Sequence, residues 1–170
     1  MDTFFEQIVA LRKTGKDIAA FVGIWVGALA LCVVLILFGG ILGTIGFLLI
    51  AGVLYGAYYL SSRLTVEYEY IVTNGTMDVD KIIAKSSRKR QLSFDLSKVE
   101  RVERYNPAAK PVGNFDKTII ACNENDPDVF FLVVCEEKKG TRLLVFSPEE
   151  RMKQAIVKFL PKYIANHAFD

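Results

Sequence analysis

The chain begins with a long, uninterrupted apolar block and continues with short segments in which apolar and polar residues alternate. From Ile18 to Leu60 there is no Asp, Glu, Lys, Arg, His, Asn or Gln. One helix of this length would be about twice as long as the hydrocarbon core, roughly 30 Å, whereas two spans of about 20 residues fit. The pattern predicts a transmembrane helical hairpin at 17–62, with spans at 18–38 and 41–60 and a reversal at Gly39-Gly40.

Basic residues lie at only one end of this predicted hairpin. Arg12, Lys13 and Lys16 precede the first span, Arg63 follows the second, and the connecting turn has no Lys or Arg. This distribution predicts that both termini are cytoplasmic and that the protein is a multi-pass plasma-membrane protein. Because the spans contain no ionisable side chain, they are expected to anchor the protein rather than to transport ions or protons.

Pairs of glycines at a spacing of four occur in both spans. Gly23 pairs with Gly27 and Gly52 with Gly56, and a further pair, Gly39 with Gly43, falls at the turn. Small residues at this spacing allow helices to approach closely in lipid. The pairs therefore predict packing of the two spans against each other, with self-association into a homo-oligomer as the alternative.

The segment 1–16 also has a helical pattern. Thr3 and Glu6 have the spacing of a capping box, and apolar residues recur at helical intervals after them, namely Phe4, Phe5, Ile8, Val9 and Leu11. Two interpretations stay open: an amphipathic helix in the headgroup region, or a cytosolic extension of the first span.

After the hairpin, residues 63–170 change to a period of two, which indicates strands. The Asn74-Gly75 pair predicts a tight hairpin turn, and residues 137–140 predict another. Seven strands are expected, at 64–72, 77–84, 88–96, 98–104, 117–123, 129–136 and 141–146.

A helix is predicted to close the chain. Ser147, Pro148 and Glu150 match an N-cap, a first-turn proline and a capping box. One apolar face follows, made of Met152, Ala155, Ile156, Phe159 and Leu160. Because a seven-stranded antiparallel sheet must bury one face and protect its edges, the expected fold is a mainly-β barrel capped by the C-terminal helix.

These segments resemble the repeat unit of bacterial PH-like (pleckstrin-homology-like) membrane-anchored proteins, and the whole chain resembles a family of small two-span bacterial membrane proteins. The likeness rests on Tyr70-Ile-Val-Thr-Asn-Gly75, on the basic Ser86-Ser-Arg-Lys-Arg90, and on Phe94, Leu96, Val99 and Val102. It implies a PH-like fold and a topology, but no reaction. The long loop Tyr105–Asp116, with Pro107, Pro111 and Gly113, departs from the usual unit.

A basic cluster is the candidate ligand site. It comprises Lys81, Lys85, Arg88, Lys89 and Arg90. Its spacing resembles the phosphoinositide-binding pattern of eukaryotic PH domains, shifted here to the second and third strands. The cluster predicts either a solvated basic turn or binding of an anionic lipid headgroup or ligand.

Composition argues against other functions. A net charge of +2 is too small for nucleic-acid binding. The three cysteines lack C-x-x-C spacing, His167 is the only histidine, and no catalytic motif occurs. We therefore expect a non-enzyme without metal or cofactor that docks an unidentified protein partner or assembles a membrane complex. The expected surfaces are the open sheet edge, the groove beside the final helix and the loop Tyr105–Asp116. Anionic-lipid or ligand sensing is the alternative, and a membrane-bound enzyme using Asp, Glu and Cys residues is the third.

Overall fold

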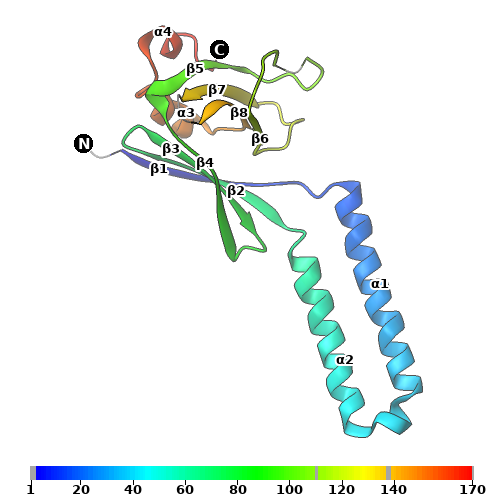
Figure 1. Cartoon of the computed structure of the whole chain (residues 1–170). Coiled ribbons are helices and arrows are strands. Elements are labelled where there is room, and N and C mark those ends of the chain that lie inside the picture. The colour runs from blue at the N-terminus through cyan, green and yellow to red at the C-terminus, as the bar shows by residue number, and fades with distance from the viewer. Residues whose placement is uncertain (1–2, 110, 137–138, 170) are drawn as a thin grey trace. The chain divides into compact units, whose positions relative to one another are not determined.

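The computed structural model describes residues 3–109, 111–136 and 139–169, with the backbone alone for residues 39–42 (Figure 1). The chain folds as two compact units. The sheet unit comprises residues 1–11, 67–82 and 87–170, and the hairpin unit comprises residues 12–66 and 83–86. The sheet unit is therefore built from segments that precede and follow the hairpin in sequence.

The hairpin unit contains helices α1 (Gly15–Leu37) and α2 (Gly39–Ser62). Thr14 caps α1: its hydroxyl accepts from the Asp17 amide at 3.3 Å, and the Asp17 carboxylate accepts from the Thr14 amide at 2.8 Å. Both helices are long and apolar enough to cross a membrane, and most of their apolar side chains are exposed. The hairpin therefore fits a two-span membrane protein.

Two details of the hairpin differ from the sequence prediction. The residue with positive φ is Gly43 (φ 52°) rather than Gly39 or Gly40, so the reversal extends further into the second apolar segment. A Cβ added at Gly23, Gly27, Gly52 or Gly56 would meet no atom within 4 Å. These glycines therefore do not make the predicted close helix contact within the hairpin, whose buried small residues, among those described, are Ala28, Cys32, Gly46, Ala57 and Ser61. Self-association through the glycines stays a prediction.

Over the residues that the structure describes, the sheet unit contains eight strands in two open sheets, not a closed seven-stranded barrel. The first sheet has the order β1-β2-β3-β4, with β1 at Phe4–Ala10, β2 at Val66–Thr73, β3 at Thr76–Ile83 and β4 at Ser87–Asp95. The second has the order β5-β7-β8-β6, with β5 at Val99–Arg104, β6 at Lys117–Ile120, β7 at Phe130–Glu136 and β8 at Gly140–Phe146. A short 3-10 turn, Leu96–Lys98, joins the sheets. The expected all-antiparallel arrangement is also wrong for one pair, because β6 runs parallel to β8.

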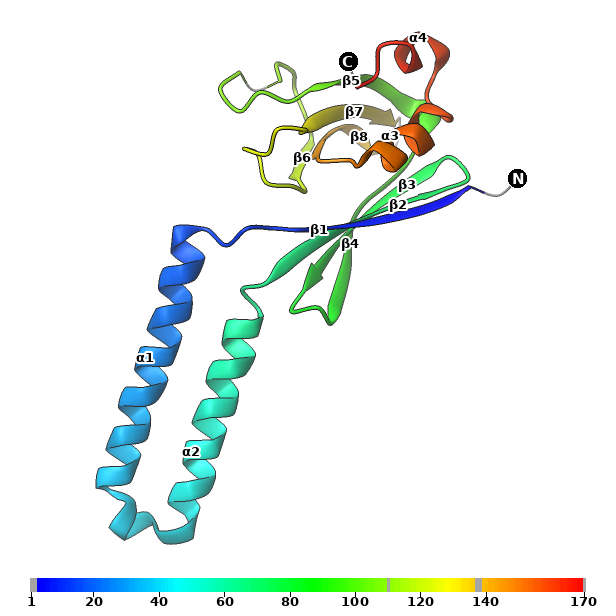
Figure 2. The same ribbon diagram turned by 180° about the vertical axis from the view of Figure 1, so that it is seen from behind.

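The predicted N-terminal helix is wrong: this segment forms strand β1, which pairs antiparallel with β2 (Figures 1 and 2). Phe4 lies opposite Thr73 and Ala10 opposite Glu67. Asn74, at the β2–β3 turn with φ 47°, fixes the start of β1: its backbone amide donates to the Thr3 carbonyl, and its side-chain oxygen accepts from the Thr3 amide, both at 3.0 Å. This pairing with a segment more than 50 residues away overrides a local pattern that fits a helix.

The core of the sheet unit lies against both sheets and helix α3 (Glu150–Val157). Tyr70 is fully buried; its hydroxyl donates to the Ala121 carbonyl at 2.6 Å, and its ring meets Phe146 edge-on. Met152 and Ile156 of α3 are also fully buried, as the predicted apolar face requires. A shorter helix, α4 (Lys162–Ala165), begins after Pro161.

The start of α3 differs from the predicted capping box. Glu149, not Ser147, occupies the N-cap position, and its side chain makes no capping bond. The Ser147 hydroxyl instead donates to the Asp128 carbonyl at 3.0 Å. The first turn is held from outside the helix, because the Gln7 side chain accepts from the Glu149 amide at 2.9 Å.

Candidate docking surface

The five predicted ligand-binding cations do not form one free basic patch. Arg88 contacts the Glu69 carboxylate at 3.0 Å. Arg90 contacts Asp78 at 3.1 Å and Asp80 at 3.0 Å. Both guanidinium groups are thus engaged by carboxylates of β2 and β3, which reduces the positive charge they present.

The other three cations are lysines at different places. Lys81 lies on β3 and Lys89 on β4, and neither side chain has an ion pair in the part of the chain that the structure describes. Lys85 lies in the β3–β4 connection with φ 54° and belongs to the hairpin unit. Sequence spacing predicts one cluster, but strand pairing places carboxylates beside its two arginines.

Glu69 is a buried acid at the centre of this charged network. Its side chain has no exposed surface. Burial and a side-chain hydrogen bond with Glu6 of β1 raise the pKa of Glu69, and the nearby Arg88 opposes that shift.

The described residues contain no set of three or more side chains that could hold a metal ion. Burial, with the nearby Asp126 and Glu124 carboxylates, raises the pKa of the Cys122 thiol to about 12. This thiol stays protonated at neutral pH, and a protonated thiol is a poor nucleophile. Neither feature supports a reaction site.

Strand β1 forms one edge of the first sheet, and part of its backbone is unpaired. Because Thr3 and Asn74 are hydrogen-bonded partners, the register directs the peptide groups of Phe5, Gln7 and Val9 toward β2. The peptide groups of Phe4, Glu6 and Ile8 point away from the sheet. Among the described residues, no hydrogen bond uses these outward groups. Only at the end of the strand does Asn123 donate to the Ala10 carbonyl, at 3.4 Å.

The unpaired edge is also apolar. The side chains of Phe4 and Ile8 are 65% and 50% exposed. Glu6, which lies between them, is the one charge on this side of the strand. Sheet edges are usually protected by several charges, prolines or bulges, so this edge is suited to accept another strand.

A groove of about 520 Å³ lies between β1 and α3. Phe4, Phe5 and Ala155 line it with apolar surface, and Arg151 and Lys158 of the helix side add two cations. Within the described part of the chain, neither cation has an ion pair, and no acidic side chain lines the groove. An acidic, partly apolar segment complements this lining.

Gln7 fixes α3 beside β1, and its side chain is only 7% exposed. Its amide nitrogen donates to the Ser147 carbonyl at 3.0 Å, while its amide oxygen accepts from the Glu149 amide at 2.9 Å. Both ends of the side chain are therefore satisfied by the backbone that leads into the helix. The groove and the open edge depend on the same strand. The sequence offers one signal of this role of β1, namely that Gln7 is a glutamine among the mainly apolar residues 4–10.

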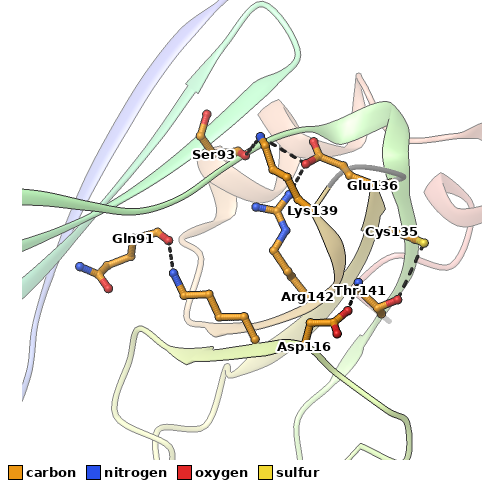
Figure 3. Close-up of polar contacts among 9 residues, drawn as sticks. Gln91, Ser93, Asp116, Cys135, Glu136, Lys139, Thr141 and Arg142 are labelled. Carbon is orange, nitrogen blue, oxygen red and sulfur yellow. Dashed lines mark hydrogen bonds and ion pairs between the residues drawn. The ribbon is translucent and has the colours of Figure 1, made fainter.

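The opposite edge of this sheet, β4, is closed by side chains. Lys117 donates to the Gln91 carbonyl at 2.8 Å, and Lys139 donates to the Ser93 carbonyl at 3.4 Å (Figure 3). The Gln91 side chain donates to the Lys89 carbonyl at 3.2 Å. Three alternate carbonyls of β4 are thus occupied.

Residues 1–166 match the family described as Bacterial PH-like domain (DUF6106). No curated protein matches the chain, and no solved structure does. The match includes β1, both hairpin helices and the sheets, and it confirms the resemblance drawn from the strand motifs.

Proposed function

The chain belongs to the bacterial PH-like domain family, and on that premise we propose that it is a non-enzymatic, membrane-anchored module that docks a protein partner by strand addition to β1. The observation that carries the proposal is the unpaired peptide edge of Phe4, Glu6 and Ile8. An extended segment that pairs with this edge gains main-chain hydrogen bonds, and pockets beside the edge select its side chains.

The partner segment is extended and carries acidic and apolar residues. Arg151 and Lys158 attract acidic groups, and Phe4 and Phe5 provide apolar surface next to them. A second copy of this chain is a poorer match, because pairing β1 with β1 around Glu6 places two glutamates opposite each other.

Docking takes place at the cytoplasmic face of the plasma membrane in this proposal. Since β1 precedes α1 and β2 follows α2, and since the two strands pair, both ends of the hairpin are on the same side of the membrane. The basic residues that flank the hairpin, Arg12, Lys13, Lys16 and Arg63, favour the cytoplasmic side.

Anionic-lipid sensing through the basic cluster is the second candidate function. Lys81 and Lys89 support it, because their ammonium groups have no carboxylate partner among the described residues. The pairing of Arg88 and Arg90 with acids weakens it. Strand addition is therefore the better-supported function.

Site-specific photocrosslinking in native membranes tests the docking proposal. A photoreactive phenylalanine at Phe4 is expected to capture one defined protein, and Ile8→Pro is expected to reduce the yield at least about tenfold. Proline at Ile8 removes an outward N–H without removing a bond to β2. Ile8→Thr keeps that N–H and is the matched control, expected to retain most of the yield.

A photoreactive residue at Val112, which is 90% exposed on the long loop, gives the background. Equal capture at Phe4 and Val112, or equal yield from Ile8→Pro and Ile8→Thr, would contradict strand addition. Capture lost on charge reversal of Lys81 and Lys89, but not with Ile8→Pro, would favour the basic cluster instead.

A further inference from the structure

The two central strands of the second sheet, β7 and β8, are apolar on both faces, whereas strands of an antiparallel pair commonly have one polar face. In β7, five consecutive residues from Phe130 to Val134 are buried, and in β8 the residues from Leu143 to Phe146 are buried. One set of alternate side chains, Phe130, Leu132, Leu144 and Phe146, belongs to the main core. The other set forms a second cluster with Tyr105, Cys122 and Val129.

The loop Tyr105–Asp116 covers this second cluster. Its end is fixed to β8, because the Asp116 amide donates to the Thr141 carbonyl and the Asp116 carboxylate accepts from the Thr141 amide, both at 2.8 Å (Figure 3). Near its start, Asn106 accepts from the amides of Ala108 and Ala109. Phe115 packs against the cluster and so closely over Gly113 that a Cβ there would lie 2.6 Å from its ring.

The cover is incomplete beside β6. A cavity of about 280 Å³ remains between the loop and strands β6 and β8. An apolar cavity of roughly 150 Å³ is enough to bind benzene. The space here therefore accommodates a molecule of about two fused rings.

The lining defines the chemistry of an occupant. Among the described residues, no charged side chain lines the cavity; the lining residues are Tyr105, Pro111, Phe115, Thr118, Ile120, Leu143 and Val145. A charged occupant would lose its hydration without gaining a charged partner, so the lining disfavours it. The Tyr105 hydroxyl donates to Glu124 at 2.8 Å, so its oxygen keeps acceptor capacity for one ligand donor.

We propose that this cavity binds a small, uncharged, mainly apolar molecule that carries one N–H or O–H donor. The ring system lies against Phe115, Leu143 and Val145, and the donor faces the Tyr105 hydroxyl. The site is separate from the β1 edge and does not depend on docking there.

Methyl NMR of the full chain in nanodiscs of zwitterionic lipid tests the proposal, with indole as the probe. Indole is expected to shift the methyl signals of Ile120, Leu143 and Val145 in a saturable way. The Ile45 methyl in the hairpin reports on indole dissolved in the lipid, and its signal is expected to change linearly. Unsaturable shifts at all four residues would overturn the proposal.

Two pairs of variants or probes make the test specific. Thr118→Phe fills the cavity and is expected to weaken indole binding at least about tenfold, whereas Val112→Phe adds the same ring at an exposed position and leaves binding unchanged. Tyr105→Phe is expected to weaken binding of indole but not of indene, which has the same shape without the N–H. Wild-type affinity in Thr118→Phe, or equal binding of indole and indene to the wild-type chain, would contradict the site as described.

Discussion

The two edges of the first sheet differ in how far their outward backbone groups are hydrogen-bonded. At β4, the carbonyls of Lys89, Gln91 and Ser93 each accept a side-chain hydrogen bond. At β1, the peptide groups of Phe4, Glu6 and Ile8 have no partner among the described residues. Because an open edge favours pairing with other chains, proteins usually close it. In the proposed function the open edge of β1 binds a partner strand, whereas the side-chain bonds along β4 close the other edge of the sheet.

The difference between the two edges is related to the order of the elements along the chain. β4 is closed by Lys117 and Lys139, which lie at the start of β6 and in the β7–β8 turn. β1 is separated from its partner β2 by both hairpin helices. The strand that precedes the hairpin in the chain is thus also the strand with the unpaired edge.

The largest expected effect comes from removing β1. A chain that begins at Arg63 loses β1, the packing of the half-buried Phe5 and Val9, and both bonds made by Gln7. Burying one such apolar side chain stabilises by up to about 1.5–3 kcal/mol, and leaving one buried polar partner unsatisfied costs about 1–3 kcal/mol. We expect a loss of more than about 4 kcal/mol, measured as aggregation or as a cooperative unfolding transition that disappears.

A matched chain keeps β1 without the anchor. Residues 12–65 are replaced by a short Asn-Gly-containing loop, which joins two strands already in antiparallel register, with Ala10 opposite Glu67. This chain is expected to be soluble and to unfold cooperatively. Equal stability of the two truncated chains would mean that β1 is dispensable to the sheet.

An element of this fold can be predicted from the sequence when the contacts that decide it are between residues close together in the chain. The seven strands after the hairpin can be predicted to within a few residues, because period-two alternation and the Asn74-Gly75 turn are local signals. The resemblance to bacterial PH-like proteins is confirmed as well, since its motifs lie within those strands and turns.

The predictions that fail depend on distant residues. The segment of β1 fits a helix as well as a strand, since Phe4, Phe5, Ile8 and Val9 satisfy both periods and only pairing with β2 decides between them. The spacing of Arg88 and Arg90 is typical of ligand-binding cations, and strand pairing places Glu69, Asp78 and Asp80 beside them. Ligand binding by the basic cluster stays a prediction.

A smaller effect is expected from opening the β4 edge. Lys117→Met with Lys139→Met removes the two bonds to β4 carbonyls, and Lys139→Met also removes the ion pair with Glu136 at 3.3 Å. Exposed hydrogen bonds and ion pairs contribute little, so the loss in the free energy of unfolding should be about 1 kcal/mol or less. The main result should be increased self-association, measured by analytical ultracentrifugation of the protein in detergent.

Lys81→Met with Lys89→Met removes equal charge without opening the edge, and it should leave self-association unchanged. Equal self-association of the two double variants would attribute the effect to net charge.

The smallest expected effect concerns the protonation of Glu69, the buried acid of β2 beside the edge strand. Because the folded-state pKa of Glu69 is raised above its ordinary value of 4.5, the contribution of this group to stability is fully present below about pH 4.5. That contribution is lost as pH rises through the folded-state pKa of Glu69, because its buried carboxylate then carries a charge close to Glu6. Hydrogen exchange of the Gln7 and Val9 amides, which point toward β2, should therefore become faster than the intrinsic rate predicts as pH rises.

Glu6→Gln should flatten this pH dependence. Its amide can donate to the Glu69 carboxylate, which favours the ionised form and lowers the pKa of Glu69. Arg88 and Asp80 also act on Glu69, and both are unchanged in this variant. Glu100→Gln, at an exposed position of β5, removes the same charge elsewhere and should keep the wild-type profile. If Glu6→Gln and Glu100→Gln gave the same profile, the pairing of β1 with β2 would not depend on the protonation of Glu69. Gln7 and the backbone hydrogen bonds to β2 would then be sufficient to hold β1 in the sheet.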